Sequence, residues 1–408
     1  MKPVHAGRGV AIFHADCKDV MARFRENSVD AIVTDPPYDL LSTSRGGSGR
    51  SNEPDNPHGR HGSRGGGFMG LAWDATGVAF DPKTWGILGR TMKPGAHLVA
   101  FGGERTYHRL ACAVEDAGFE VRFMLLWLHG QGFPKSLDVG KAMDRAAGAK
   151  RAVLGQGPFA SRRPMADHDK QGITFADDSY VRPAGHVITS PATNAASQWD
   201  GWGTALKPAA TPILLARKPL SEPTVAANVL RWGTGALNID GCRIIWDGDA
   251  PSIGTPGWGG PQKKLTVAPT TCGDTVSRIP PSPRGRWPAN LILDEEAARM
   301  LDEESGELTS GRTPAEGSGG ASRFFYTAKA DAEDRDGTRH PTVKPVDLMK
   351  WLVRLVTPPR GLVLDPFMGS GPTVAAARDL GFRIIGIDKE MNYCVDAARR
   401  LRQGVLPL

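Results

Sequence analysis

The chain has 408 residues and a formal net charge of +6, and 40% of its residues are hydrophobic. This length allows one large domain with insertions or two domains, and the composition is ordinary for a globular protein. The positive charge is compatible with a polyanionic partner, and equally with a mildly basic enzyme that binds no nucleic acid.

No apolar run approaches the ~18 residues of a membrane-spanning helix, and the first residues contain no apolar signal-peptide segment. The five cysteines are scattered without a CxxC pair, which argues against a disulfide framework and a zinc site. We therefore expect a soluble, cytoplasmic protein that binds no membrane and no metal.

Strand-like and helix-like segments alternate over the first third of the chain. The expected strands are residues 10–15, 29–34, 97–101 and 120–128, and the expected helices are 17–25, 82–91 and 104–116. The last seventy residues continue the pattern with strands at 361–364 and 383–387 and helices at 345–356, 372–380 and from 391. This alternation predicts an α/β fold with a parallel sheet.

The middle of the chain is irregular. Glycine and proline make up about one residue in five, against an average near 12%. Regular patterns are lost in residues 43–67, 149–209 and 247–287, and they return briefly at 212–217 and 222–231. A compact domain carries so much irregular chain mainly where the loops have a task.

A hydrophobic strand runs into the turn Asp365-Pro-Phe-Met-Gly369-Ser-Gly371, which opens a helix. Glycines let the backbone approach a ligand closely, and doubly wound sheets bind nucleotide-like ligands at such turns. The next strand ends at Asp388, where an acid can accept hydrogen bonds from both hydroxyls of a ribose. The pattern favours an adenosine-containing cofactor over the alternative, a tight turn with a surface aspartate.

The strand at 29–34 stops at Asp35-Pro36-Pro37-Tyr38, because proline cannot donate to a sheet ladder. The exocyclic amine of adenine is a poor nucleophile, because its lone pair is delocalised into the ring. A site that accepts hydrogen bonds from both N–H groups favours a pyramidal nitrogen, whose lone pair can attack a methyl donor. Asp35 and the Pro36 carbonyl supply two such acceptors, and the Tyr38 ring offers a stacking surface for an extruded base. A plain β-turn is the alternative.

Together these segments resemble a known family. Residues 34–38 (TDPPY) are similar to the catalytic motif of DNA amino-methyltransferases, 367–371 (FMGSG) to their motif for S-adenosylmethionine (AdoMet), and 340–345 (HPTVKP) to a third segment. The catalytic motif precedes the cofactor motifs, which is the permuted order of the β-class. Further segments, 130–136, 201–208, 286–290 and 325–326, resemble phage and prophage members.

The resemblance implies a mostly parallel, seven-stranded Rossmann-like α/β sheet of the AdoMet-dependent methyltransferase type, with a long inserted recognition region. Residues 1–148 would form the catalytic half with the loop 43–67. Residues 149–325 would form the insertion with some core strands, and residues 326–408 the AdoMet-binding half.

The resemblance also implies site residues. The catalytic ones are Asp35, Pro36, Pro37 and Tyr38, and the AdoMet contacts are Asp16, Thr342, Lys344, Asp365, Phe367, Gly369, Ser370, Gly371 and Asp388. Asp16 is either an adenine contact or a helix N-cap. Asp365 either receives the ammonium of the cofactor or only shapes its turn. Lys344 either pairs with the cofactor carboxylate or is an exposed lysine, and Glu390 competes with Asp388 for the ribose.

Four arginines stand among the glycines of the loop 43–67: Arg45, Arg50, Arg60 and Arg64. We expect this loop to close on double-stranded DNA with the arginines on phosphates, and a flexible solvated tether is the alternative. Base readout is expected within about residues 145–325, where no helix-turn-helix signature indicates which side chains read bases.

These inferences combine into methyl transfer from AdoMet to adenine N6 of duplex DNA in a bacterial or phage-infected cell, by base flipping and direct SN2 attack. Adenine is favoured because cytosine-N4 members of the family more often carry Ser in place of Asp35. The alternatives are a cytosine-N4 enzyme, an RNA or protein-glutamine methyltransferase, whose motifs usually run in the opposite order, and a DNA-binding protein without catalysis. A homodimer and a partner restriction enzyme are left open.

Overall fold

The computed structural model describes residues 2–7, 9–39, 76–130, 132, 136–156, 187–245, 285–306, 319–329 and 343–403. The chain divides into two compact units. The larger unit comprises Met1–Gln131 and Ala209–Leu408, and the smaller one Gly132–Pro208.

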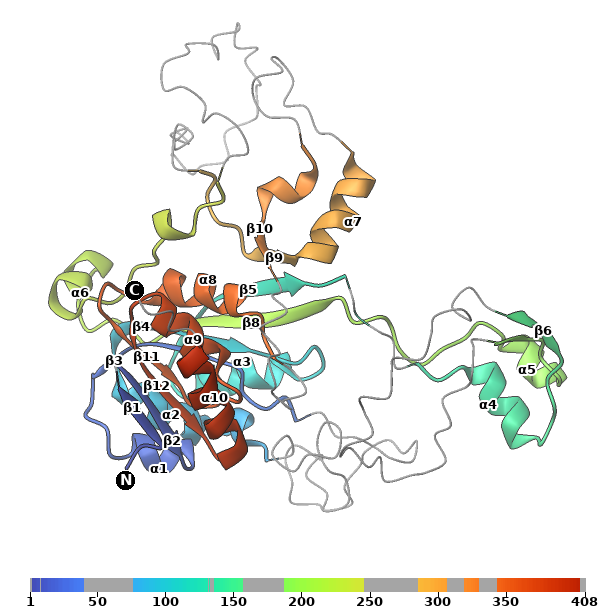
Figure 1. Cartoon of the computed structure of the whole chain (residues 1–408), viewed down its shortest axis with the longest axis horizontal. Coiled ribbons are helices and arrows are strands. Elements are labelled where there is room, and N and C mark those ends of the chain that lie inside the picture. Colours follow the sequence, from blue (N-terminus) through green and yellow to red (C-terminus); the bar gives the residue numbers. More distant parts are fainter. Residues whose placement is uncertain are drawn as a thin grey trace, which may run out of the picture. The chain divides into compact units, whose positions relative to one another are not determined.

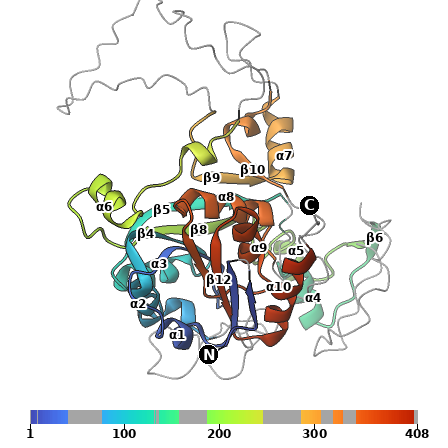
Figure 2. The ribbon, with the colours of Figure 1, turned by 60° about the vertical axis from the view of Figure 1, so that its left-hand side comes forward.

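The larger unit is built on one sheet, drawn in Figures 1 and 2. Its strands are β1 (His5–Gly7), β2 (Val10–His14), β3 (Val29–Thr34), β4 (Met92–Phe101), β5 (Glu120–Leu128), β8 (Ala210–Arg217), β9 (Leu291–Asp294), β10 (Tyr326–Ala328), β11 (Leu362–Asp365) and β12 (Arg383–Asp388). Their spatial order is β1-β2-β12-β11-β3-β4-β8-β5-β9-β10. Because β2, β12, β11 and β3 are mutually parallel, their carboxyl ends meet at one edge of the sheet.

The sheet is mostly parallel, as predicted: six of its nine strand pairings are parallel and three antiparallel. The predicted number of seven strands is wrong, since the described residues form ten. The additional strands lie at the two edges. β1 pairs with β2 as an antiparallel hairpin. β9, from the predicted insertion, and β10, at the start of the predicted AdoMet-binding half, continue the sheet in parallel beyond β5. They provide hydrogen-bond partners for edge groups that would otherwise be unpaired.

Helices cover both faces of this sheet (Figures 1 and 2). They are α1 (Cys17–Met21), α2 (Pro82–Thr91), α3 (Tyr107–Asp116), α6 (Val225–Trp232), α7 (Glu295–Ser305), α8 (Val346–Val356), α9 (Pro372–Asp379) and α10 (Met391–Gln403), with 3-10 turns at Val78–Phe80, Asp240–Cys242 and Ala321–Phe324. Several starts follow simple rules: Asp81 accepts a hydrogen bond from the Lys83 amide at the start of α2, and Pro82 occupies its first turn.

The two faces have separate apolar cores, which follow the two-residue period of the strands. In β3, Ala31 and Val33 pack in the core that α8, α9 and α10 complete. Ile32, which points the other way, packs in the core completed by α1, α2 and α3. All six residues of β3 are buried, so the strand places Thr34 and the motif that follows it rigidly at the sheet edge.

The smaller unit contains α4 (Val139–Ala146), α5 (Asn194–Gln198) and an antiparallel pair, β6 (Val153–Gln156) and β7 (Val187–Thr189). Its buried Asp144 accepts hydrogen bonds from the backbone amides of Ala192 and Thr193, each 3.0 Å away, and so joins α4 to the segment before α5. Arg151 lies 3.5 Å from the same carboxylate. The predicted division into catalytic, recognition and cofactor-binding parts concerns function and stays a prediction.

Candidate active site

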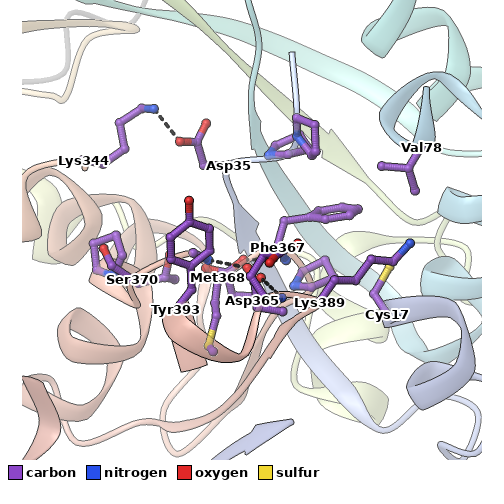
Figure 3. A pocket seen from close by; sticks show the side chains of 18 of the residues that line it. Cys17, Asp35, Val78, Lys344, Asp365, Phe367, Met368, Ser370, Lys389 and Tyr393 are labelled. Atoms are coloured by element: carbon purple, nitrogen blue, oxygen red, sulfur yellow. Dashed lines mark hydrogen bonds and ion pairs between the residues drawn. The ribbon is translucent and has the colours of Figure 1, made fainter. Parts of the chain in front are cut away.

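A cavity of about 410 Å³ lies at the carboxyl ends of the parallel strands in the larger unit. Its walls come from the turn after β3, the turn after β11 and the end of β12, segments far apart in the sequence. Figure 3 shows side chains from these segments around the same space. Ligands bind outside the carboxyl ends of strands in open α/β sheets, so this cavity is the candidate site.

The first wall is the segment Asp35–Pro36–Pro37–Tyr38, and all four residues line the cavity. The Tyr38 hydroxyl donates to Asp35 Oδ1 over 2.7 Å. The Thr106 hydroxyl donates to the Tyr38 carbonyl over 2.9 Å, which ties this turn to the start of α3. Asp35 and Tyr38, the first and last residues of the motif, are therefore joined by a side-chain hydrogen bond, which a plain β-turn does not require.

Lys344 reaches the same carboxylate from the segment before α8. Its Nζ lies 2.5 Å from Asp35 Oδ2 and 3.1 Å from the Tyr38 hydroxyl oxygen. The lysine is only 6% exposed, so the alternative of an exposed lysine is wrong. Figure 3 shows Lys344 and Asp35 pointing toward one another.

The second wall is the turn after β11. Asp365 is 1% exposed, and its Oδ1 accepts hydrogen bonds from the Thr34 hydroxyl (2.7 Å) and the Phe367 amide (3.2 Å). The Thr34 bond joins the two predicted motifs directly. Burial raises the pKa of the Asp365 carboxyl to about 7, although hydrogen bonds from Thr373, Thr34 and Phe367 oppose the shift.

The glycines of this turn have backbone conformations that other residues rarely adopt. Gly369, which lines the cavity, has φ of 51°, and Gly371, the N-cap of α9, has φ of 81°. Ser370, between them, is buried, and its hydroxyl has no hydrogen-bond partner in the part of the chain that the structure describes. Ser370 is one of the residues that line the cavity.

Asp388 closes the third wall at the end of β12. One carboxylate oxygen accepts from the Gly369 amide (2.9 Å) and the other from the Glu390 amide (2.8 Å). Burial raises the pKa of the Asp388 carboxyl to about 6, although these two hydrogen bonds oppose the shift. Each oxygen keeps a lone pair for a further donor. Glu390 also lines the cavity.

Asp16 caps a helix. It accepts from the Lys18 amide over 2.8 Å at the start of α1, and its other oxygen lies 2.6 Å from Lys389 Nζ. Its neighbours Ala15 and Cys17 line the cavity, whereas Asp16 is not among the lining residues. Burial raises the pKa of the Cys17 thiol to about 12, so it stays protonated and is no nucleophile.

Other predicted residues lie outside the described ranges. These are Thr342, Arg45, Arg50, Arg60 and Arg64. Conversely, the cavity has lining residues that the motifs did not indicate, namely Thr76, Val78, Met349, Thr373, Lys389 and Tyr393. They come from elements that pack beside the motif turns. Their spacing in the sequence does not indicate that they reach the cavity.

Two expectations concern absences. Within the described ranges, no helix is long and apolar enough to cross a membrane. Among the same residues, no group of three or more His, Cys, Asp or Glu side chains is arranged to hold a metal ion.

Comparisons with known proteins agree with the turn after β11, which lies inside the matched residues. Residues 274–399 match the N6_N4_Mtase family model, described as DNA methylase. The chain is 40% identical over 78 residues to the type II methyltransferase M.HinfI of Haemophilus influenzae, and 41% identical over 66 residues to the type II methyltransferase M2.LlaDCHI of Lactococcus lactis subsp. cremoris. These alignments cover 19% and 16% of this chain, but only 22% and 24% of the relatives.

Among solved structures, the PvuII DNA methyltransferase (cytosine-N4-specific) aligns over 100% of this chain and 91% of its own, with 11% identity and a TM-score of 0.47. The family match and the two relatives support a DNA amino-methyltransferase of the N6/N4 class. The segments aligned with the curated relatives span about a quarter of those proteins.

Proposed function

We propose that the protein is an AdoMet-dependent DNA methyltransferase that modifies the N6 amine of adenine in duplex DNA. One observation carries the proposal: the Asp35–Tyr38 turn and the Asp365–Gly371 turn open into the same cavity and are joined by the Thr34–Asp365 hydrogen bond. An amine held by the first turn therefore meets a cofactor held by the second.

The residues of the second and third walls fit AdoMet. Buried Asp365 suits the ammonium group, the two free lone pairs of Asp388 suit the ribose hydroxyls, and the Ser370 hydroxyl needs a partner. The glycine turn permits close approach of a ligand to the backbone. When bound, AdoMet supplies an electrophilic methyl group.

The first wall handles the target base. Asp35 and the Pro36 carbonyl accept the two amine hydrogens and hold the nitrogen with its lone pair facing the cofactor turn. Tyr38 supplies an aromatic face for the extruded base. Orientation of this kind accounts for much of the rate of enzymes that bring two bound groups together.

Adenine is proposed over cytosine because Asp35 stands where cytosine-N4 members of the family more often carry Ser. Both bases present an exocyclic amine with two hydrogens, so the same two acceptors serve either one. Cytosine N4 is therefore the second candidate, and the product of the reaction distinguishes the two.

The decisive experiment is methyl transfer from AdoMet to unmethylated plasmid and phage DNA, followed by mass spectrometry of the digested nucleosides. We expect N6-methyladenine with the wild-type protein. Asp35→Ala should lower the rate by ~10²-fold or more, because one of two acceptors that orient the amine is lost.

The matched control is Asp116→Ala, which removes an exposed carboxylate at the end of α3 and should leave the rate unchanged. N4-methylcytosine in the digest would reassign the base and keep the site. AdoMet binding without any methylated base would contradict the proposed activity.

A further inference from the structure

We propose that Lys344 is a positioning residue for the reaction: its ammonium group fixes both the Asp35 carboxylate that holds the amine and the Tyr38 ring that holds the base. This inference rests on the function proposed above and adds a role for a residue that the motif resemblance places beside the cofactor.

Three side chains form a closed set of contacts. Lys344 Nζ lies 2.5 Å from Asp35 Oδ2, Tyr38 donates to Asp35 Oδ1 over 2.7 Å, and Lys344 Nζ lies 3.1 Å from the Tyr38 hydroxyl oxygen. Each carboxylate oxygen thus has one donor, which sets the rotation of the carboxylate. A carboxylate oxygen can accept a second hydrogen bond, so the arrangement leaves room for the amine and does not block it.

The lysine itself is held firmly and can act as a fixed reference point. Its ammonium lies 4.8 Å from the centre of the Phe101 ring and 5.4 Å from that of the Tyr38 ring, distances typical of cation–π contacts. The side chain is 8% exposed, and the next residue, Pro345, is the N-cap of α8. A buried lysine with these partners has few alternative rotamers.

The charges around Asp35 show why a cation is needed there. The carboxyl of Asp365 lies nearby, linked through Thr34, and its negative charge, when ionised, repels that of Asp35. Without Lys344, Asp35 would turn away from Asp365 toward solvent, since its side chain is 22% exposed. The ammonium offsets the repulsion and keeps the carboxylate facing the cavity.

The test is Lys344→Met, which preserves an apolar stem between the two rings and removes the ammonium. We expect the single-turnover methylation rate at saturating AdoMet and plasmid DNA to fall ~10–100-fold, because misplacement of a reacting group by about 1 Å costs up to ~10²-fold. The Kd for AdoMet, measured by calorimetry without DNA, should stay within about twofold of wild type, because Lys344 acts through Asp35 and Tyr38.

The matched control is Lys350→Met, which breaks the half-buried ion pair between Lys350 of α8 and Asp379 of α9 and should change neither quantity. The binding stoichiometry from calorimetry gives the folded fraction of each variant. A rise of tenfold or more in the AdoMet Kd would overturn the inference and assign Lys344 to the cofactor carboxylate. An unchanged rate would also overturn it. The wild-type protein, measured in parallel, separates both results from failure of the proposed function, because in that case the wild type itself makes no methylated base.

Discussion

At the scale of single residues, the site is organised by two buried or half-buried acids that the fold brings together. Thr34, the last residue of β3, donates to Asp365, the last residue of β11, so neighbouring parallel strands deliver the two motifs to each other. Asp365 is almost completely removed from solvent. A carboxylate in that position costs stability when it is charged, and this cost is open to measurement.

Asp365→Asn should therefore stabilise the protein at pH 8. The folded protein holds the Asp365 proton with a pKa of about 7, mainly because of burial, whereas the unfolded chain releases it near the ordinary pKa of 3.8. The contribution of Asp365 to the free energy of unfolding is therefore largest below pH ~4, and it is lost as the pH rises toward 7. Asn keeps the shape and the acceptor and has no charge to bury, so its advantage, on the order of a few kcal/mol, should be largest above pH 7.

The measurement is the thermal unfolding midpoint without cofactor at pH 5 and pH 8. We expect the gain to be clearly larger at pH 8 than at pH 5, while AdoMet binding weakens because the proposed partner of its ammonium is lost. Asp116→Asn, at an exposed position, should show no pH-dependent gain. An equal gain at both pH values would mean that ionisation of Asp365 is not its cause.

Sequence reasoning reached most residues of the site but not their mutual contacts. The DPPY and glycine turns follow hydrophobic strands, and parallel strands bring such turns to one edge, so their convergence was predictable. The contact between Lys344 and Asp35 joins positions 309 residues apart. Its geometry depends on how α8 packs beside the sheet, which no local pattern encodes.

At the scale of elements, long and well-bounded segments were predicted closely. The buried strand at 29–34 and the capped helix at 82–91 agree with β3 and α2 in both bounds. β4 starts at Met92 and includes Lys93-Pro94-Gly95, so it begins earlier than the expected strand at 97–101. The Pro94 carbonyl accepts from Asn228 and Thr234, distant residues that support this start of the strand.

The segment β9–α7–β10 was not predicted. Its strands have four and three residues and are bordered by glycine- and proline-rich chain, so they carry little periodic signal. They form because β5 presents a free edge to them. Their pairing is a tertiary effect, beyond the reach of local propensity.

The turn that opens α9 makes a sharp prediction about one glycine. Gly371 has φ of 81°, and a Cβ there would lie 2.7 Å from the Ala397 Cβ of α10. Gly371→Ala therefore suffers both a left-handed backbone and a clash. Gly381→Ala, with φ of 76° and no atom within 4 Å of its Cβ, suffers only the first, which costs ~1–2 kcal/mol.

Urea unfolding should show Gly371→Ala to be less stable than Gly381→Ala by ~1 kcal/mol or more. Adding Ala397→Gly to Gly371→Ala should recover part of the loss, so that the double variant is more stable than the sum of the single effects predicts. Simple additivity would show that the helix α10 adjusts without cost and that the close approach is not limiting.

At the scale of the whole molecule, the smaller unit is inserted in the chain between β5 and β8, two strands that pair with each other in the sheet. β5 and β8 are antiparallel, with Leu128 opposite Ala210, and the His129 amide donates to the Ala209 carbonyl over 3.0 Å. The two ends of the insertion are therefore as close as the ends of a hairpin loop. The elements of the unit also pair among themselves, β6 with β7 and α4 with the segment before α5.

Replacing residues 131–208 by a short Asn-Gly turn should then leave the larger unit folded. We expect an AdoMet Kd within about twofold of wild type, because the residues proposed to bind the cofactor all lie in the larger unit. DNA methylation should fall strongly, since the insertion carries more Lys and Arg than acidic residues and much of the proposed recognition region. Calorimetry with AdoMet and nucleoside analysis of plasmid DNA test the two statements separately.

If methylation persisted at wild-type level and at the same sites, recognition would have to reside in residues 209–325, and the insertion would need a different function. If AdoMet binding were lost as well, the insertion would be required for the fold of the sheet, in spite of the hairpin geometry at its ends.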